Sequence, residues 1–135
     1  MSSDDARERF AGSPVARLAT VSAAVRPRLV PIVFVVVGAV IYTSVDAKPK
    51  TTLSLRRLAD IAANPAVSVL VDFYSDDWTQ LWWARADGDA RIAATAEAET
   101  AKRRLAGRYP DYIAEPPPGP VIAIDVARWS GWRAR

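Results

Sequence analysis

Residues 29–65 carry the pattern that decides the fold, an apolar hairpin followed by a basic turn and a helix. They read LVPIVFVVVGAVIYTS, then VDAKPK, then TTLSLRRLADIAANP. Val and Ile are stiff at χ1 and fit a pleated surface, so the first part favours strands. Gly38 interrupts it where a chain reversal needs a permissive backbone. The pattern predicts strands over residues 28–37 and 40–44, joined by a tight turn at residues 38–39.

The turn and the helix that follow this hairpin are basic. Lys48 and Lys50 lie in the turn, Arg56 and Arg57 lie in the helix, and the helix ends before Pro65 because the preceding residue leaves the helical region. A Lys-Pro-Lys turn by itself is typical of solvated surface. Here it precedes a helix start, where free backbone N–H groups and cations favour phosphate or carboxylate, and this position predicts an anion site.

Two further helices are expected from the charge pattern and from capping residues. One covers residues 4–11 with Ser3 as its cap, and the other covers residues 96–107, with acidic side chains early and basic ones late. Residues 110–120 are expected to form a proline-rich loop, and residues 128–133 a tail.

Further strands are expected at the remaining apolar runs. They cover residues 15–22, 66–74 and 121–126, and a long extended segment covers residues 78–95 with a break at residues 87–88. Consecutive strands joined by hairpins favour an antiparallel sheet, and about six of them favour closure into a barrel. The sequence therefore predicts a mainly β, α+β domain: an antiparallel six- or seven-stranded β-barrel with flanking helices.

Length and composition limit the possible chemistry. The chain has 135 residues, which is expected to form a single domain. It contains no Cys and no His, which excludes disulfides, thiolate nucleophiles, Ser-His-Asp triads and His-ligated metals. The formal net charge of +3 is too small to argue for nucleic-acid binding from charge alone.

The sequence gives no reason to expect a membrane protein. The N-terminus, MSSDDARERF, is charged and mixed in sign, unlike a signal peptide. The longest apolar run, residues 29–42, contains Pro31 and Gly38 and is shorter than the roughly 20 residues that a spanning helix needs. We therefore expect a cytoplasmic protein with no membrane partner.

With these features, the chain resembles the flavin- and deazaflavin-binding split β-barrel proteins related to pyridoxamine 5′-phosphate oxidase. The resemblance runs from about residue 15 to residue 132 and rests on the order and spacing of short markers. These are residues 15–20 (VARLAT), Pro31, residues 41–44 (IYTS) and residues 64–68 (NPAVS). Residues 46–50 (DAKPK) and 72–78 (DFYSDDW) are similar to an actinobacterial subgroup thought to use the deazaflavin coenzyme F420 rather than FMN.

The resemblance implies a homodimer with the cofactor in a groove at the subunit interface. It also implies which residues hold the phosphate, add charge for the phosphate or for the polyglutamate tail of F420, or pass under the ring. These are Thr43, Ser44 and Arg57 for the phosphate, Lys48 and Lys50 for added charge, and Pro31, Ile32 and Val33 under the ring. Arg57 stands eight residues before Pro65, where the family usually has a lysine, and the basic turn is longer than usual.

The five tryptophans admit two interpretations. In the first, Trp82 or Trp83 fills the core or the dimer interface, since successive strand residues face opposite sides of a sheet. In the second, one or two tryptophans line the ring pocket and come from the neighbouring subunit. Trp78 and Trp132 are then the candidates.

The activity that the resemblance implies is oxidoreduction. Reduced F420 would hand a hydride to a small electron-poor alkene, imine or quinone, while the protein supplies binding, orientation and exclusion of water. No catalytic residue is expected, in keeping with a chain that lacks His and Cys. The alternatives are an FMN-binding reductase or oxidase of the same fold, a non-catalytic F420 carrier, a haem-type ligand, and a barrel that binds single-stranded nucleic acid through Trp and Arg.

Overall fold

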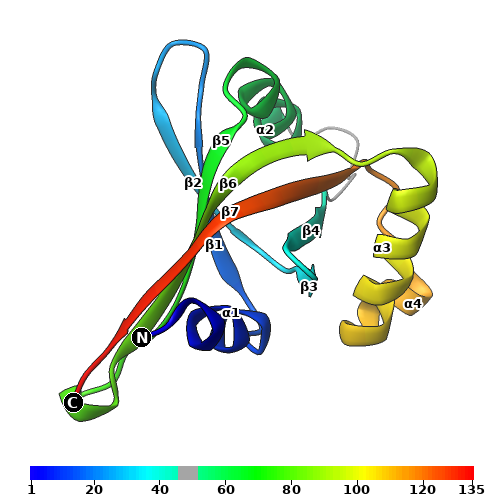
Figure 1. Ribbon diagram of the computed structural model, residues 1–135. Coiled ribbons are helices and arrows are strands. Elements are labelled where there is room, and N and C mark those ends of the chain that lie inside the picture. The colour runs from blue at the N-terminus through cyan, green and yellow to red at the C-terminus, as the bar shows by residue number, and fades with distance from the viewer. Residues whose placement is uncertain (46–51) are drawn as a thin grey trace.

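The computed structural model describes residues 1–45 and 52–135, with side chains from residue 56 onward in the second range. Seven antiparallel strands form one sheet in the order β2-β1-β5-β6-β7-β4-β3, with helices on its flanks (Figure 1). The strands are β1 (Ala16–Val21), β2 (Pro27–Ile32), β3 (Val35–Val37), β4 (Val40–Ser44), β5 (Ala66–Phe73), β6 (Trp82–Ile92) and β7 (Val121–Arg133). The helices are α1 (Ser3–Ala11), α2 (Thr52–Ala63), α3 (Thr95–Arg108) and the single turn α4 (Asp111–Ala114).

The sheet is curled into a half-barrel, as its strand order requires. Strands β2 and β3 lie at opposite edges of the sheet, yet only Val33 and Phe34 separate them in the chain. Three Cα–Cα steps span at most about 11 Å, so the two edges must approach each other. This confirms the predicted antiparallel split barrel.

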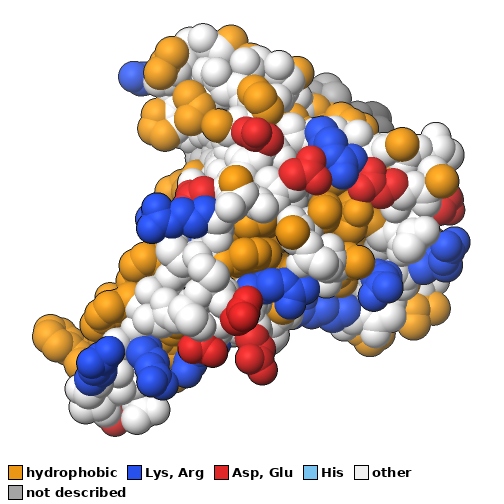
Figure 2. Space-filling view, viewed as in Figure 1, with side chains coloured by type: hydrophobic (Ala, Val, Ile, Leu, Met, Phe, Trp, Pro, Cys, Tyr) orange, Lys and Arg blue, Asp and Glu red, His pale blue; other side chains and the backbone are white. Residues whose placement is uncertain are grey.

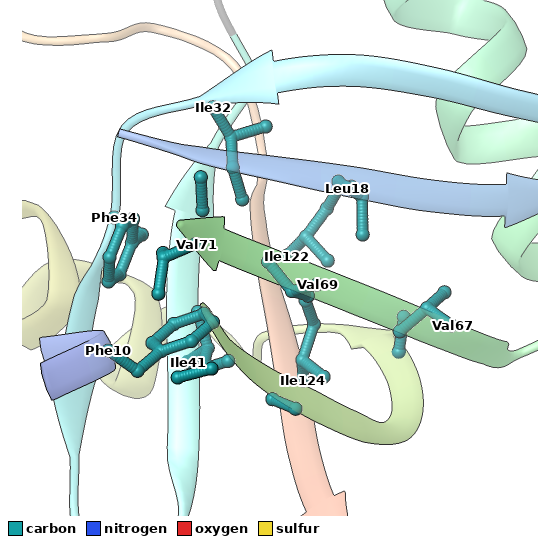
Figure 3. Packing of buried hydrophobic residues seen from close by; sticks show 14 of the residues in the cluster. Phe10, Leu18, Ile32, Phe34, Ile41, Val67, Val69, Val71, Ile122 and Ile124 are labelled. Atoms are coloured by element: carbon teal, nitrogen blue, oxygen red, sulfur yellow. The ribbon is translucent and has the colours of Figure 1, made fainter. Parts of the chain in front are cut away.

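The core fills the inner face of the curled sheet. Alternate residues of β1 and β5, such as Leu18, Val69 and Val71, are buried there together with Ile122 and Ile124 of β7 (Figure 3). Helix α1 packs across β6 and β7 and inserts the ring of Phe10, which lies 5.0 Å from the ring of Phe34 and 5.2 Å from that of Trp129. The aromatic contacts join the N-terminal helix to the joint between β2 and β3.

Several predicted elements are confirmed. Gly38 has a positive φ of 61° and turns the chain between β3 and β4. Helix α2 ends at Ala63, and the side chain of Asn64 donates hydrogen bonds to the carbonyls of Val21 and Ser22. The amide of Asn64 thereby ties the end of α2 to the end of β1.

Two strand predictions are wrong. The expected strand over residues 28–37 is two strands, because the chain leaves one edge of the sheet after Ile32 and joins the other edge at Val35. The extended segment expected over residues 78–95 begins with a 3₁₀ turn, η1 (Trp78–Gln80). It has no break at residues 87–88, since β6 runs through them with a β-bulge.

Three smaller details also differ from the sequence predictions. Residues 128–133, expected only as a tail, belong to β7 and pair with β6 as far as Arg133. The cap of α1 is Ser2, whose Oγ accepts a hydrogen bond from the Asp5 N–H, in place of Ser3. The proline-rich loop includes the helical turn α4.

The ends of β5, β6 and β7, together with η1, project from the half-barrel as an arm, seen at the lower left of Figure 1. The arm carries exposed aromatic side chains, namely Phe73, Tyr74, Trp78 and Trp132. Figure 2 shows hydrophobic side chains along the arm and Lys or Arg side chains near its end. None of the helices in the described part of the chain is long and apolar enough to cross a bilayer.

Candidate functional site

A cleft with three arginines lies between α2 and the hairpin of β1 and β2. We call it the arginine cleft; its volume is about 160 Å³. The residues that line it are three cations, one carboxylate, one hydroxyl and two apolar residues, namely Arg28, Arg56, Arg57, Asp60, Thr20, Leu29 and Val30. Whole small-molecule ligands usually occupy about 300–1,000 Å³, so this cleft suits one end of a larger ligand.

Asp60 forms the buried floor of the arginine cleft. Its side chain is 5% exposed, and its Oδ2 accepts a hydrogen bond of 3.2 Å from Thr20 Oγ1. The same oxygen lies 3.5 Å from Nε of Arg28, whose side chain reaches the surface. A carboxylate from α2 is thereby tied to both strands of the hairpin.

Arg56 and Arg57 provide positive charge on the α2 side of the arginine cleft. Arg56 is exposed, whereas Arg57 is half-buried and its pKa is lowered by burial. A guanidinium stays protonated in proteins, so Arg57 is a partly desolvated cation. Such a group gains most from a charge-assisted hydrogen bond to an anion.

The residues expected under the ring gather at the joint between β2 and β3. Thr43 Oγ1 donates a hydrogen bond of 2.8 Å to the carbonyl of Val33, which fixes β4 to the joint. Thr43 is 1% exposed, so its hydroxyl is committed to Val33. Ile32 points into the core, and Pro31 lies on the opposite, exposed face of β2.

Ser44 ends β4 with a buried hydroxyl. Its Oγ has no hydrogen-bond partner in the part of the chain that the structure describes. Buried polar atoms are rarely left unpaired, because an unpaired one costs about 1–3 kcal/mol. Lys48 and Lys50, which were predicted to add positive charge to the site, lie outside the described residues.

Trp78 and Trp132 lie on the arm, and within one chain the structure does not bring them to the arginine cleft. Figure 1 places the arm and α2 at opposite ends of the molecule. Trp78 is 76% exposed and Trp132 is 46% exposed. Trp82 is instead half-buried on the inner face, where the guanidinium of Arg9 lies 5.3 Å from its ring.

The model of the pyridoxamine 5′-phosphate oxidase family matches residues 2–133 of the chain. The chain belongs to the pyridoxamine 5′-phosphate oxidase family. The search of curated proteins found no match.

Solved structures share this family's fold with the chain. A conserved hypothetical protein from Mycobacterium tuberculosis is 21% identical with a TM-score of 0.75, and the alignment covers 100% of this chain and 86% of that one. An FAD-binding protein from Mycobacterium smegmatis is 20% identical with a TM-score of 0.70, covering 100% and 97%. A heme-binding protein from the same organism is 16% identical with a TM-score of 0.79, covering 98% and 54%.

Sequence reasoning identified the two arginines of α2 but missed Arg28, Thr20 and Asp60. The signal for Asp60 was its place between Leu58 and Ile61, because an acidic residue beside buried positions of a helix needs a partner. Nothing local marked Arg28, since the register of β2 against β1 decides which of its side chains face α2.

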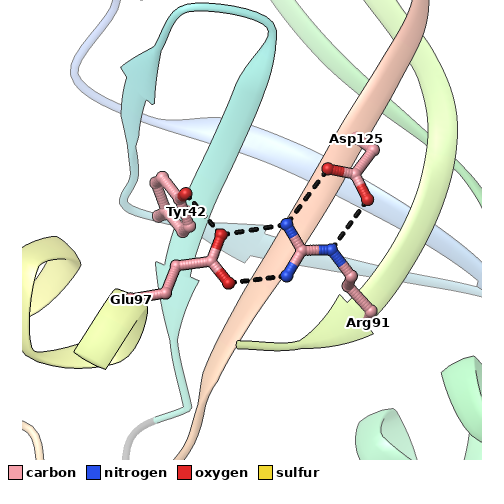
Figure 4. A network of polar contacts seen from close by, with 4 residues as sticks. All are labelled: Tyr42, Arg91, Glu97 and Asp125. Carbon is pink, nitrogen blue, oxygen red and sulfur yellow. Dashed lines mark hydrogen bonds and ion pairs between the residues drawn. The ribbon is translucent and has the colours of Figure 1, made fainter. Parts of the chain in front are cut away.

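A second polar cluster ties α3 to the barrel (Figure 4). Arg91 of β6 donates to both carboxylate oxygens of Glu97, at 2.6 and 2.9 Å, and to both of Asp125, at 2.8 and 3.2 Å. The Tyr42 hydroxyl donates to Glu97 at 2.7 Å. Hydrogen bonds from Arg91 and then from Tyr42 lower the pKa of Glu97 to about 2, while burial and Glu97 raise that of Tyr42 to about 12.

No part of the described chain groups three acidic side chains in a way that could hold a metal ion. The arginine cleft is the candidate functional site, because three cations converge on it.

Proposed function

We propose that the chain binds a phosphorylated flavin-type cofactor with its phosphate in the arginine cleft. The observation that carries the proposal is the convergence of Arg28, Arg56 and the half-buried Arg57 on one small cleft. Guanidinium groups match phosphate oxygens in geometry and charge. The volume of the cleft suits a phosphoryl end and leaves the ring outside it.

The ring, in this proposal, lies along the joint between β2 and β3. Pro31, Ile32 and Val33 would offer backbone groups to its polar edge. The hydroxyl of Ser44, which has no partner among the described residues, would offer a further hydrogen bond to the ligand. Thr43 would act indirectly, since its hydroxyl holds the carbonyl of Val33.

The remaining wall of the site is proposed to come from a second copy of the chain. The strand register places Leu29, Leu70 and Trp132 on the face of the sheet opposite the core, and these side chains are 75%, 38% and 46% exposed. Exposed aromatic and apolar side chains with Arg17 and Arg85 beside Leu70 support an interface here, because aromatic residues and arginines are enriched at interfaces. In a dimer formed through this face, Trp78 and Trp132 of one arm would cover the ring held by the partner.

We propose coenzyme F420 as the cofactor. Lys48 and Lys50 support this choice, because the basic sequence before α2 provides charge beyond the needs of one phosphate. When bound in its reduced form, F420 supplies a hydride to a small electron-poor substrate. The chain's own residues bind it, orient it and exclude water, and none of them is assigned as a catalytic residue.

FMN is the alternative cofactor, and its support comes from the fold. Two structural neighbours are described as FAD-binding proteins, so the same barrel holds a flavin elsewhere. Haem is less well supported, although two neighbours are described as heme-binding and heme-storage proteins. Haem iron is most often held by His or Cys, and the chain has neither.

Titration monitored by tryptophan fluorescence tests the proposal. Wild-type protein is titrated with F420, FMN and riboflavin, and the titrations are repeated on Arg57→Ala. Removing the charge-assisted contact is expected to weaken binding of the two phosphorylated ligands by about tenfold or more and to leave riboflavin unaffected.

The matched control is Arg103→Ala on α3, which removes an exposed arginine away from the arginine cleft. A carrier without turnover would bind F420 equally well and reduce no acceptor, so a hydride-transfer assay separates the two. Equal binding of FMN and riboflavin by the wild type would contradict the proposal.

A further inference from the structure

Asp60 is unexpected in a cleft that binds an anion. Its carboxylate lies at the floor of the arginine cleft, and a negative charge there repels a phosphate. If Asp60 acted on the ligand only through its charge, the cleft would bind anions better without it. The contacts of Asp60 indicate a different role.

Those contacts hold Arg28 by one particular atom. Asp60 Oδ2 lies 3.5 Å from Nε of Arg28, on the side of the guanidinium nearest the chain. Within residues 1–45 and 56–135, this guanidinium makes no hydrogen bond and no other ion pair. Its two terminal nitrogens therefore remain available to a ligand.

The carboxylate itself is held in place from a third element. Thr20 Oγ1 of β1 donates to the same Oδ2 at 3.2 Å, so the position of that oxygen is set by β1 and by α2 together. Thr20 is 3% exposed and Asp60 is 4% exposed. Because this buried oxygen is held by a hydrogen bond, its ion pair with Nε restrains the position of the Arg28 guanidinium.

We propose that Asp60 is a positioning residue for the ligand phosphate. By engaging Nε, it turns the terminal nitrogens of Arg28 toward the arginine cleft, opposite the arginines of α2. A phosphoryl group then meets cations from both walls. This inference rests on the proposed function, because it concerns the same site.

The direction in which Asp60→Asn changes the affinity for the anion tests the proposal. Asp60→Asn removes a negative charge from beside the bound anion, so by charge alone it should tighten binding. If Asp60 positions Arg28, the same change weakens binding, because the amide holds the guanidinium less firmly and the fork of Arg28 loses its orientation. The direction of the change separates the two roles.

The experiment measures the preference for the phosphate as a ratio of dissociation constants. Two ligand pairs are used, FMN with riboflavin and F420 with the deazariboflavin fragment that lacks its phosphate. For Asp60→Asn we expect the ratio of the phosphate-free to the phosphorylated dissociation constant to fall about tenfold. A loss of fold alone would weaken both members of a pair and leave this ratio unchanged.

Further variants test whether Asp60 affects phosphate binding by orienting Arg28. Arg28→Lys keeps the charge but has no Nε fork, and it is expected to lower the ratio as Asp60→Asn does. The double variant is expected to lower it no further than either single change. Thr20→Val, which removes only the donor to Oδ2, should lower the ratio by a smaller factor and serves if Asp60→Asn does not fold.

The outcomes distinguish the two proposals. If the wild type binds both members of each pair equally, the cleft takes no phosphate, and both proposals fail. If the wild type prefers the phosphorylated ligands and Asp60→Asn keeps or increases that preference, the positioning role is wrong while the proposed function stands. Additive effects of Asp60→Asn and Arg28→Lys would also overturn the positioning role.

Discussion

Gly88 lies at the β-bulge of β6 against β7, where the backbone of β7 leaves no room for a side chain. A Cβ built on Gly88 would lie 2.1 Å from the carbonyl oxygen of Asp125. The sequence suggested a break in the strand here, because glycine usually interrupts a strand. The structure instead uses the glycine for a close approach of two backbones, which keeps β6 continuous through the register shift.

We therefore expect Gly88→Ala to destabilise the protein by roughly 1–3 kcal/mol, as overpacking in a tight site does. The matched control is Gly107→Ala in α3, where an added Cβ meets no atom within 4 Å. There alanine should stabilise the helix by roughly 0.5–1 kcal/mol. Chemical denaturation midpoints measure both changes, and similar effects of the two substitutions would contradict the steric explanation.

Single residues of the candidate site were only partly predictable from the sequence. Arg56 and Arg57 were identified because they follow a basic turn in the chain. Arg28 and Asp60 were not, because their pairing depends on how α2 packs on the hairpin, which no local pattern specifies. Ser44 was expected to bind phosphate, and the structure adds that its buried hydroxyl lacks a partner among the described residues.

Elements were predicted best where local signals and tertiary pairing agree. The turn at Gly38 and helix α2 have such signals, and both are confirmed. The break between β2 and β3 had none, since the run of Val and Ile is equally apolar on both sides of Val33. The end of β7 became a strand because β6 pairs with it, and that partner lies far away in the sequence.

The cluster around Arg91, which joins α3 to the barrel, makes the free energy of unfolding depend on pH. The pKa of Glu97 is lowered to about 2 from its usual 4.5, so its ionised form is stabilised in the folded state. This contribution is present above about pH 5 and is lost as the pH falls toward 2. We expect wild-type protein to lose more unfolding free energy over this range than Glu97→Gln.

Denaturant unfolding at several pH values measures this difference between wild type and Glu97→Gln. The control is Glu99→Gln on the same helix, whose carboxylate is exposed. It is expected to show the pH dependence of the wild type. Parallel pH profiles for wild type and Glu97→Gln would show that the cluster around Arg91 does not contribute to acid sensitivity.

At the scale of the whole molecule, the exposed outer face of the sheet leads us to expect a dimer at micromolar concentration. Leu70 lies in the middle of this face, paired with Arg17 on one side and Arg85 on the other. Leu70→Lys would add a positive charge beside Arg17 and Arg85 in the interface, so it should shift the protein toward monomers. Sedimentation velocity measures the shift.

Ile113→Lys on α4 is the matched control, because Ile113 is 69% exposed but lies away from the outer face. It should leave the dimer intact. A wild-type protein that sediments as a monomer would contradict both the dimer and the shared wall of the proposed site. The sequence alone predicted this assembly only through the family resemblance, since the outer face is defined by strand register.

The two-residue joint between β2 and β3 couples parts of the molecule that the hydrogen-bonded sheet keeps at opposite edges. Because only two residues join these strands, we expect a displacement of β2 relative to α2 to be passed on to Val33 and the opposite edge of the sheet. We therefore expect the width of the arginine cleft to be coupled to the position of the joint on which the ring is proposed to lie. A ligand whose phosphate is bound in the arginine cleft would then also reduce the mobility of the joint between β2 and β3.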